Sequence, residues 1–252
     1  MTMQVARVGV TPLKGAQHEA LGRLDLTGAG PVDDRVFCLV DRRRQRVVRT
    51  VEDRSMVAVL ARLRDGILAT RVAGEEASGV PEPTGEALHC DYWGRRVELQ
   101  VQRSAHADLL SRHLGRPVEL ARVCRTGAVV YGAPVTLLST TALDELADRV
   151  GVATVDPARF RATVAVDDRQ QGVALEHVPP GTRLRVGGAV LELAGGVPRC
   201  AVVDLDPSTG RKDSCLLAAL AGYRRAAGEV FFGRYARVVS PGRVSPGDDV
   251  ER

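Results

Sequence analysis

One cysteine of this chain directly follows an arginine, in the pair Arg199-Cys200. A cysteine thiolate is a soft ligand for transition metals, and a fixed guanidinium beside it suits a metal carried by an anionic organic cofactor. Arg199 is also expected to lower the pKa of the thiol and so favour the reactive thiolate. The segment Ala201–Asp204, predicted as a short strand, and the turn Asp206–Gly210 would support this cysteine. The alternative is an inert cysteine that packs as a small apolar side chain, but the neighbouring arginine favours a functional thiol.

Two basic residues in the first part of the chain stand at the ends of predicted strands. Lys14 follows the first strand, where it could supply a point charge to a phosphate while Gly15 lets the backbone approach. Arg35 opens a later strand and follows Asp33 and Asp34. An inward-facing arginine could clamp an anion through two hydrogen bonds. The alternatives are a surface lysine and a surface ion pair of little energetic value.

Two further segments carry candidate binding groups. Ser139, Thr140 and a third hydroxyl residue lead a predicted helix. Capping explains one hydroxyl but not three, and free hydroxyl and N–H groups at a helix start bind anions. In the predicted strand that begins at Phe160, Arg159 and Arg161 fall on the face opposite Phe160. This arginine face is interpreted equally well as a ligand-binding surface or as a solvated one.

Short strands dominate the predicted secondary structure. Each is β-branched or alternates between apolar and polar residues, and Gly, Pro or charged turns separate them. Many short strands at close spacing favour barrels over a doubly wound sheet. We therefore expect a mainly β, α+β fold with two β-barrel-like units and a few helices. The predicted strands are Gln4–Val10, Arg35–Val40, Arg46–Thr50, Gly66–Val72, Arg96–Val101, Pro117–Ala121, Phe160–Val166, Thr182–Val186, Ala189–Ala194 and Phe232–Val239.

Apolar residues at helical spacing predict three helices. These are Ser104–Leu114, Thr141–Val150 and Asp213–Ala227. A boundary within Arg122–Gly132 is expected to divide the chain into residues 1–122, a barrel that ends in a helix, and residues 123–252, a β-rich unit with two helices. The segment Ala73–Glu86 is rich in Gly, Pro, Glu and Ser and is predicted to be a flexible loop.

Composition argues against several classes of protein. The 252 residues carry a formal net charge of +4 and five widely spaced cysteines, without the spacing of a zinc finger or an iron–sulfur site. No basic stripe with interleaved aromatic residues is present, so nucleic-acid binding is not expected. No run of about 18 apolar residues predicts a membrane span, and the opening residues lack the apolar core of a signal peptide. Free thiols are typical of a reducing compartment, so we expect a cytoplasmic protein.

Six short motifs occur along the chain in a fixed order. They are Pro12-Leu13-Lys14-Gly15; Asp34-Arg35 before Phe37; Leu138–Leu143; Phe160-Arg161; Arg199-Cys200 followed by Asp206-Pro207 and Thr209-Gly210; and Phe232-Gly233 with Tyr235, Pro241-Gly242 and Gly247-Asp248. In this order they resemble the MOSC domain preceded by the MOSC N-terminal β-barrel domain. That is the arrangement of the amidoxime-reducing component, which is related to the C-terminal part of molybdenum cofactor sulfurase. The resemblance covers nearly the whole chain.

The resemblance implies roles for the candidate residues. Cys200 would be the thiolate ligand of molybdenum in the molybdenum cofactor, Mo-molybdopterin, and would therefore be the catalytic residue. The protein would be an oxidoreductase that reduces an N-oxygenated small molecule with electrons from a separate protein of flavin, ferredoxin or cytochrome type. The residues that would hold the pterin and its phosphate are Lys14, Gly15, Arg35, Ser139, Thr140, Arg161, Arg199 and Tyr235.

Two alternatives to this function stay open at this point. Cys200 could carry a persulfide in sulfur transfer, in which case pyridoxal phosphate would belong only to a partner desulfurase. The protein could also be a non-catalytic carrier of the molybdenum cofactor. One departure from the family is that Ala162 and Thr163 stand where its motif has Pro-Asn. We therefore expect an altered substrate, and the alternative is a degenerate site.

Overall fold

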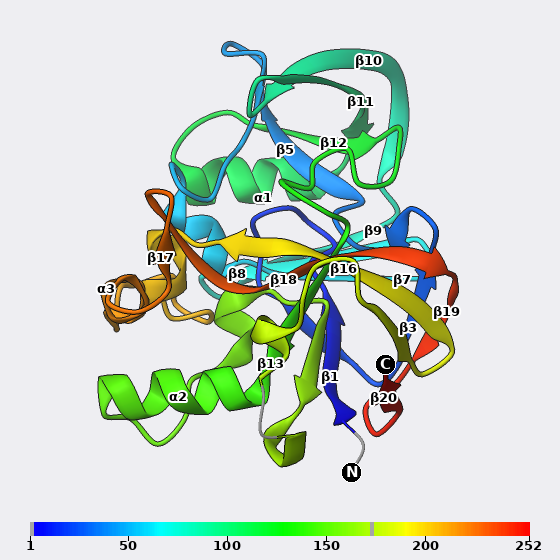
Figure 1. The fold of residues 1–252 in the computed structure, drawn as a ribbon. Helices are drawn as coiled ribbons and strands as arrows, with labels where there is room; N and C mark the ends of the chain where they lie inside the picture. Colours follow the sequence, from blue (N-terminus) through cyan, green and yellow to red (C-terminus); the bar gives the residue numbers. More distant parts are fainter. Residues whose placement is uncertain (1–2, 172–173) are drawn as a thin grey trace.

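The computed structural model describes residues 3–171 and 174–252, so the first two residues of the segment examined for a signal peptide lie outside it. The described chain forms two closed β-barrels (Figure 1). The prediction of a mainly β fold with two barrel-like units and a few helices is confirmed. In the described part of the chain, no helix is both long and apolar enough to cross a membrane.

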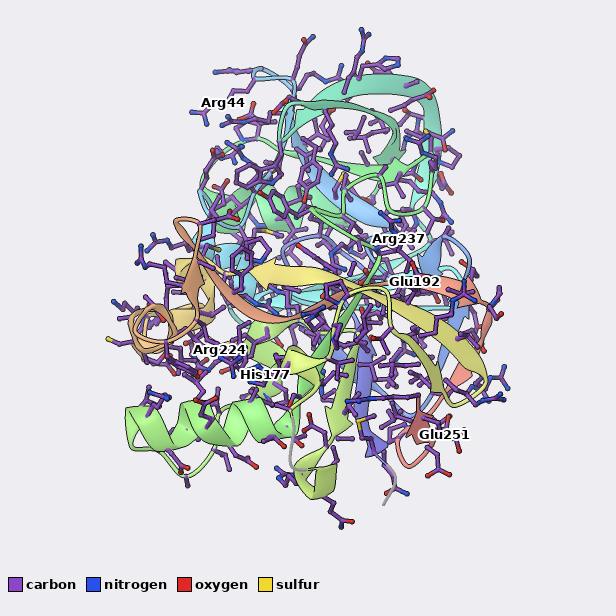
Figure 2. The ribbon with its side chains drawn as sticks, viewed as in Figure 1. Arg44, His177, Glu192, Arg224, Arg237 and Glu251 are labelled. Atoms are coloured by element: carbon purple, nitrogen blue, oxygen red, sulfur yellow. The ribbon has the colours of Figure 1, made fainter. Side chains whose placement is uncertain are left out.

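The larger barrel has seven strands, and it closes where β13 pairs with β18. Its strands alternate buried and outward residues: Leu191 and Leu193 are buried, whereas Glu192 lies outside opposite Arg237 of the next strand (Figure 2). All neighbouring strands are antiparallel except β13 and β14. In order the strands are β13 (Val135–Ser139), β14 (Val164–Asp167), β1 (Met3–Val10), β20 (Asp249–Glu251), β15 (Arg183–Val186), β16 (Ala189–Pro198) and β18 (Glu229–Ser240).

The smaller barrel has five strands and is flanked by α1 (Ala105–Leu114) (Figure 1). Leu109 and Leu110 of α1 are buried in the same apolar cluster as Leu39 and Leu120 of the barrel. The strands are β10 (Glu82–Tyr92), β11 (Arg95–Arg103), β12 (Glu119–Val123), β5 (Phe37–Asp41) and β6 (Arg46–Val47). The chain therefore starts in the larger barrel with β1, leaves it to form the smaller barrel, and returns after β12.

The remaining elements form small sheets and a helical layer. Helices α2 (Thr140–Val150) and α3 (Leu216–Ala221) pack together, with Leu146 and Leu220 buried in one cluster with Phe232. Two sheets have three strands each: β7 (Leu60–Arg64), β8 (Ile67–Val72) and β9 (Glu75–Gly79); and β19 (Gly242–Val244), β3 (Leu24–Thr27) and β4 (Gly30–Pro31). The short strands β2 (Glu19–Leu21) and β17 (Arg225–Ala226) pair with β1 and β18.

The prediction of a flexible loop over Ala73–Glu86 is wrong, because most of this segment lies in β9 and the start of β10. Ala73 and Gly74, with φ of 52° and 83°, form the tight turn that leads from β8 into β9. The side chains of both strands are mostly exposed in this segment. Polar strands of this kind lack the alternation of apolar and polar residues from which a strand is predicted.

Three other predicted elements are shorter or of a different type. The helix predicted over Asp213–Ala227 is limited to α3, because the chain then turns into the β17–β18 hairpin. The strand predicted from Phe160 begins only at Val164, and Phe160 ends a 3₁₀-helix that starts with Pro157. The segment Ala201–Asp204 is also a 3₁₀-helix instead of a strand. Each segment is short, and contacts distant in sequence decide its conformation.

Candidate functional site

A cavity of about 320 Å³ lies between the two barrels and brings most of the predicted site residues together. It is lined by Lys14, Arg35, Arg161, Arg199, Cys200 and Tyr235, among others. Arg49 and Arg159 also line the cavity, which brings the lining lysine and arginine residues to six. Among the lining residues, only Glu229 carries a carboxylate. The excess of basic groups predicts affinity for an anion.

Cys200 stands where the long strand β16 has ended and the 3₁₀-helix Ala201–Asp204 begins. Its side chain is exposed, so the thiol is accessible from the cavity. The turn that follows is held by Asp206, which accepts hydrogen bonds from the Ser208 and Thr209 backbone N–H groups at 2.9 and 2.7 Å. Hydrogen bonds of this kind, first from the Ser208 hydroxyl, lower the pKa of Asp206 to about 2. The predicted supporting turn is therefore present.

Arg199 is fixed by two backbone carbonyls of the larger barrel unit. Its Nε donates to the Phe232 carbonyl at 2.8 Å and its Nη1 to the Phe160 carbonyl at 2.9 Å. The third nitrogen, Nη2, is buried and has no hydrogen-bond partner among the described residues. Burial lowers the pKa of Arg199 to about 10, against the opposing effect of Tyr235. A buried guanidinium N–H without a partner is costly, and an anionic ligand would satisfy it.

Arg161 joins the larger barrel unit to the loop that follows β1. It has a left-handed backbone with φ of 48° at the end of the 3₁₀-helix Pro157–Phe160. From there its Nε donates to the Ala16 carbonyl at 3.2 Å and its Nη2 to the Gly15 carbonyl at 3.1 Å. Burial lowers the pKa of Arg161 to about 10, and Arg35 adds to this effect. Gly15 thus contributes to the site through its carbonyl, which positions an arginine.

Lys14 and Arg35 complete the basic side of the cavity. Arg35 pairs with Asp34, whose other carboxylate oxygen accepts the Thr11 backbone N–H at 2.8 Å. The Lys14 Nζ lies 4.9 Å from the centre of the Tyr92 ring and forms no ion pair with any residue that the structure describes. Burial, together with the charges of Arg35 and Arg161, lowers the pKa of Lys14 to about 7. Lys14 therefore changes its charge near neutral pH.

Ser139 and Thr140 do not line this cavity. Ser139 is fully buried, and its Oγ accepts the Ala142 backbone N–H at 3.0 Å, so it caps α2. The Thr140 hydroxyl donates to Asp167 at 3.2 Å. Both hydroxyl groups are used within the fold, and neither supports the predicted contact with a cofactor. Tyr235, by contrast, lines the cavity, where burial raises its pKa.

The family model of the MOSC domain matches residues 110–251, which is more than half of the chain. The chain belongs to the MOSC domain family. The YuaD protein from Bacillus subtilis is similar in structure: it is 15% identical, with a TM-score of 0.47 over 99% of this chain and 94% of that chain. YiiM from Geobacillus stearothermophilus is 14% identical, with a TM-score of 0.35 over 47% of this chain and 53% of that chain. No curated protein matches the chain.

The matched MOSC region supplies only part of the cavity. The matched residues 110–251 include Arg161, Arg199, Cys200 and Tyr235. The other part of the lining precedes the matched region and includes Lys14, Arg35 and Arg49. In the described part of this MOSC protein, no three or more His, Cys, Asp or Glu side chains form a cluster that could hold a metal ion. Among the residues that line the cavity, Cys200 is the one that offers a thiol as a metal ligand.

Sequence reasoning missed the aromatic side of the site. Trp93 and Tyr131 line the cavity of this MOSC protein with their ring centres 5.4 Å apart, at an angle of 74°. Arg49, also in the lining, lies with its guanidinium carbon 4.4 Å from the centre of the Trp93 ring. One signal was available, because Trp93 is the single tryptophan of a chain with 4% aromatic residues. Its place in the turn Tyr92–Arg95, between two strands, would have marked it as exposed.

Proposed function

We propose that this MOSC protein binds the molybdenum cofactor in the cavity between its barrels and reduces an N-oxygenated small molecule with electrons from a separate protein. The observation that carries the proposal is the exposed thiol of Cys200 in a cavity with six basic side chains and one carboxylate. A thiolate is the donor that a soft transition metal takes from a protein, and arginine suits the phosphate of an anionic pterin.

The residues of the cavity fit an anionic group that carries a metal. Cys200 would bind the metal, and Lys14, Arg35, Arg161 and Arg199 would bind the phosphate and the pterin. Arg161 and Arg199 each donate two hydrogen bonds to backbone carbonyls, so the positions of both side chains are fixed before a ligand binds. The buried Nη2 of Arg199 lacks a partner among the described residues, and a phosphate or pterin oxygen would supply one.

When bound, the cofactor would supply two-electron oxygen-transfer chemistry. The net reaction consumes an N–OH group, two electrons and two protons, and yields an N–H group and water. Lys14 can hold a proton on its Nζ near neutral pH, since its pKa is lowered to about 7, and it lines the same cavity as Cys200. Lys14 would keep this proton while it binds the phosphate, because a bound anion favours the charged amine.

The test is the metal content of the protein after expression in a host that makes the cofactor. Molybdenum and pterin are measured per chain in the native protein, in Cys200→Ser and in Cys124→Ser, since Cys124 is also exposed but follows β12 of the smaller barrel and does not line the cavity. We expect near-stoichiometric molybdenum that is lost only in Cys200→Ser. Pterin without dependence on Cys200 would favour a cofactor carrier, and the absence of both metal and pterin would favour persulfide chemistry on Cys200.

A further inference from the structure

Trp93 has a costly backbone conformation for its size. It occupies the turn between β10 and β11 with φ of 55°, and Gly94 follows with φ of 76°. Asn, Asp or Gly take such left-handed turn positions at little cost, whereas a bulky side chain is an outlier there. Burial in a core does not account for the tryptophan, because 43% of its surface is exposed. A strained and exposed aromatic residue in the lining of a cavity points to a role in binding.

Tyr131 is a second exposed aromatic residue at the same place. Its surface is 54% exposed, and its ring meets the Trp93 ring in an edge-to-face arrangement. It belongs to the connection between the two barrels, so Trp93 and Tyr131 reach the cavity from different parts of the chain. The two rings are exposed, whereas Arg161 and Arg199 are buried deeply enough to lower their pKa values. The two rings therefore lie at the outer edge of the cavity.

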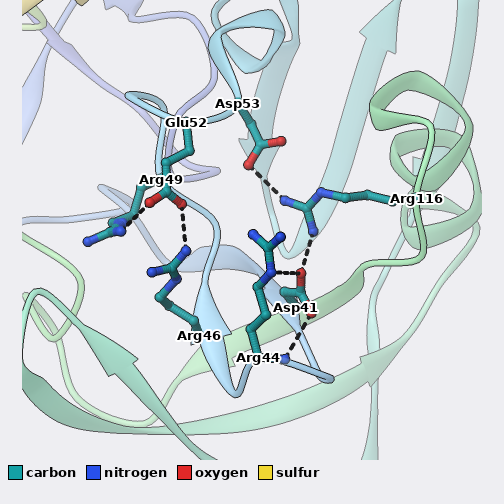
Figure 3. Close-up of polar contacts among 7 residues, drawn as sticks. All are labelled: Asp41, Arg44, Arg46, Arg49, Glu52, Asp53 and Arg116. Atoms are coloured by element: carbon teal, nitrogen blue, oxygen red, sulfur yellow. Dashed lines mark hydrogen bonds and ion pairs between the residues drawn. The ribbon is translucent and has the colours of Figure 1, made fainter.

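Arg49 is held against Trp93 by a carboxylate. Glu52 pairs with Arg49 and accepts a second hydrogen bond from Arg46 at 3.0 Å (Figure 3). Only 15% of the Arg49 side chain is exposed, and its Nε is buried without a hydrogen-bond partner among the described residues. The guanidinium next to the ring makes a cation–π contact and fixes the tryptophan from one side.

We propose that Trp93, Tyr131 and Arg49, together called the aromatic wall, form the subsite for the substrate, and that this substrate carries an aromatic or heteroaromatic ring. The assignment rests on the proposed function, since it places the N-oxygenated group of the ring compound toward Cys200. Flat rings gain contact area and quadrupole interactions from Trp and Tyr side chains.

The test uses two hydroxamic acids that differ only in the ring. Benzohydroxamic acid and acetohydroxamic acid carry the same N–OH group, and the emission of the single tryptophan reports contact at Trp93. In the protein loaded with cofactor we expect benzohydroxamic acid to quench this emission and to bind roughly tenfold more tightly than acetohydroxamic acid. Tyr131→Leu and Arg49→Met should each reduce that preference. Arg237→Met, on the outer face of β18 (Figure 2), is the matched control and should leave it unchanged.

Two results would overturn the assignment. Equal affinity for the two acids, in protein that contains molybdenum, would show that the aromatic wall does not bind the ring. Binding of benzohydroxamic acid to the protein without cofactor that is lost when the cofactor is loaded would show that the wall holds the pterin instead. Failure to take up molybdenum from a host that makes the cofactor, with the ring preference still present, would refute the proposed function and leave the aromatic wall in place. Metal content and ring preference thus test the two proposals separately.

Discussion

The charge of Lys14 should make anion binding in the cavity depend on pH. The pKa of Lys14 is lowered to about 7, first by burial and then by Arg35 and Arg161. As pH rises through this value the amine loses its proton, so the cavity loses one positive charge and anion affinity falls. Arg161 and Arg199 keep their charge in this range, because their pKa values are about 10.

The expected magnitude follows from the fraction of Lys14 that is charged. With a pKa of about 7, roughly nine-tenths of the lysine is charged at pH 6 and roughly one-tenth at pH 8. If the charged form binds much more tightly, affinity falls by up to about tenfold between these pH values, or about 1.4 kcal/mol. A bound anion favours the charged amine, so the midpoint in the complex should lie above the midpoint in the free protein.

Sulfate is a suitable probe, because it keeps its double charge over this range of pH. Its binding is measured by titration calorimetry at constant ionic strength, in the Cys200→Ser background to remove the thiol. Lys14→Arg should bind sulfate with little dependence on pH, since arginine stays charged. Lys14→Met should bind sulfate at every pH at least as weakly as the native protein binds it at pH 8, and without a dependence on pH. Constant sulfate affinity in the protein with Lys14, or the same slope in Lys14→Arg, would refute the reasoning.

Two further predictions concern residues that support the site. Ser139→Ala should lower the free energy of unfolding by about 1 kcal/mol in urea unfolding, because α2 loses its N-cap. Sulfate affinity, measured by calorimetry, should stay unchanged. A loss of sulfate affinity would mean that Ser139 contributes to the binding site. In Gly132→Ala the new Cβ would lie 2.3 Å from the Tyr235 Cζ, so the ring must move and stability should fall by about 1–3 kcal/mol. An unchanged urea midpoint would mean that Tyr235 adjusts without strain.

The order of short motifs and strands was predictable, and so were the two barrels. Alternating side chains along strands such as β1, β15 and β16 are a local property, because each strand must present one face to a core. Strands β9 and the start of β10 escaped prediction, since their side chains are largely exposed and carry no such alternation. The pair Arg199-Cys200 was also recognisable from the sequence, because residues adjacent in sequence remain adjacent in the fold.

The sequence by itself determined which chemistry was available: one thiol beside an arginine, several basic residues at strand ends, and a mainly β fold. Tertiary structure alone decided which of these groups meet. It brought Lys14 and Arg161 into one cavity, assigned the hydroxyl of Ser139 to a helix cap, and added Trp93 to the lining. These outcomes depend on strand pairing between distant segments, such as β1 with β14. Side-chain directions follow from that register, which no local pattern specifies.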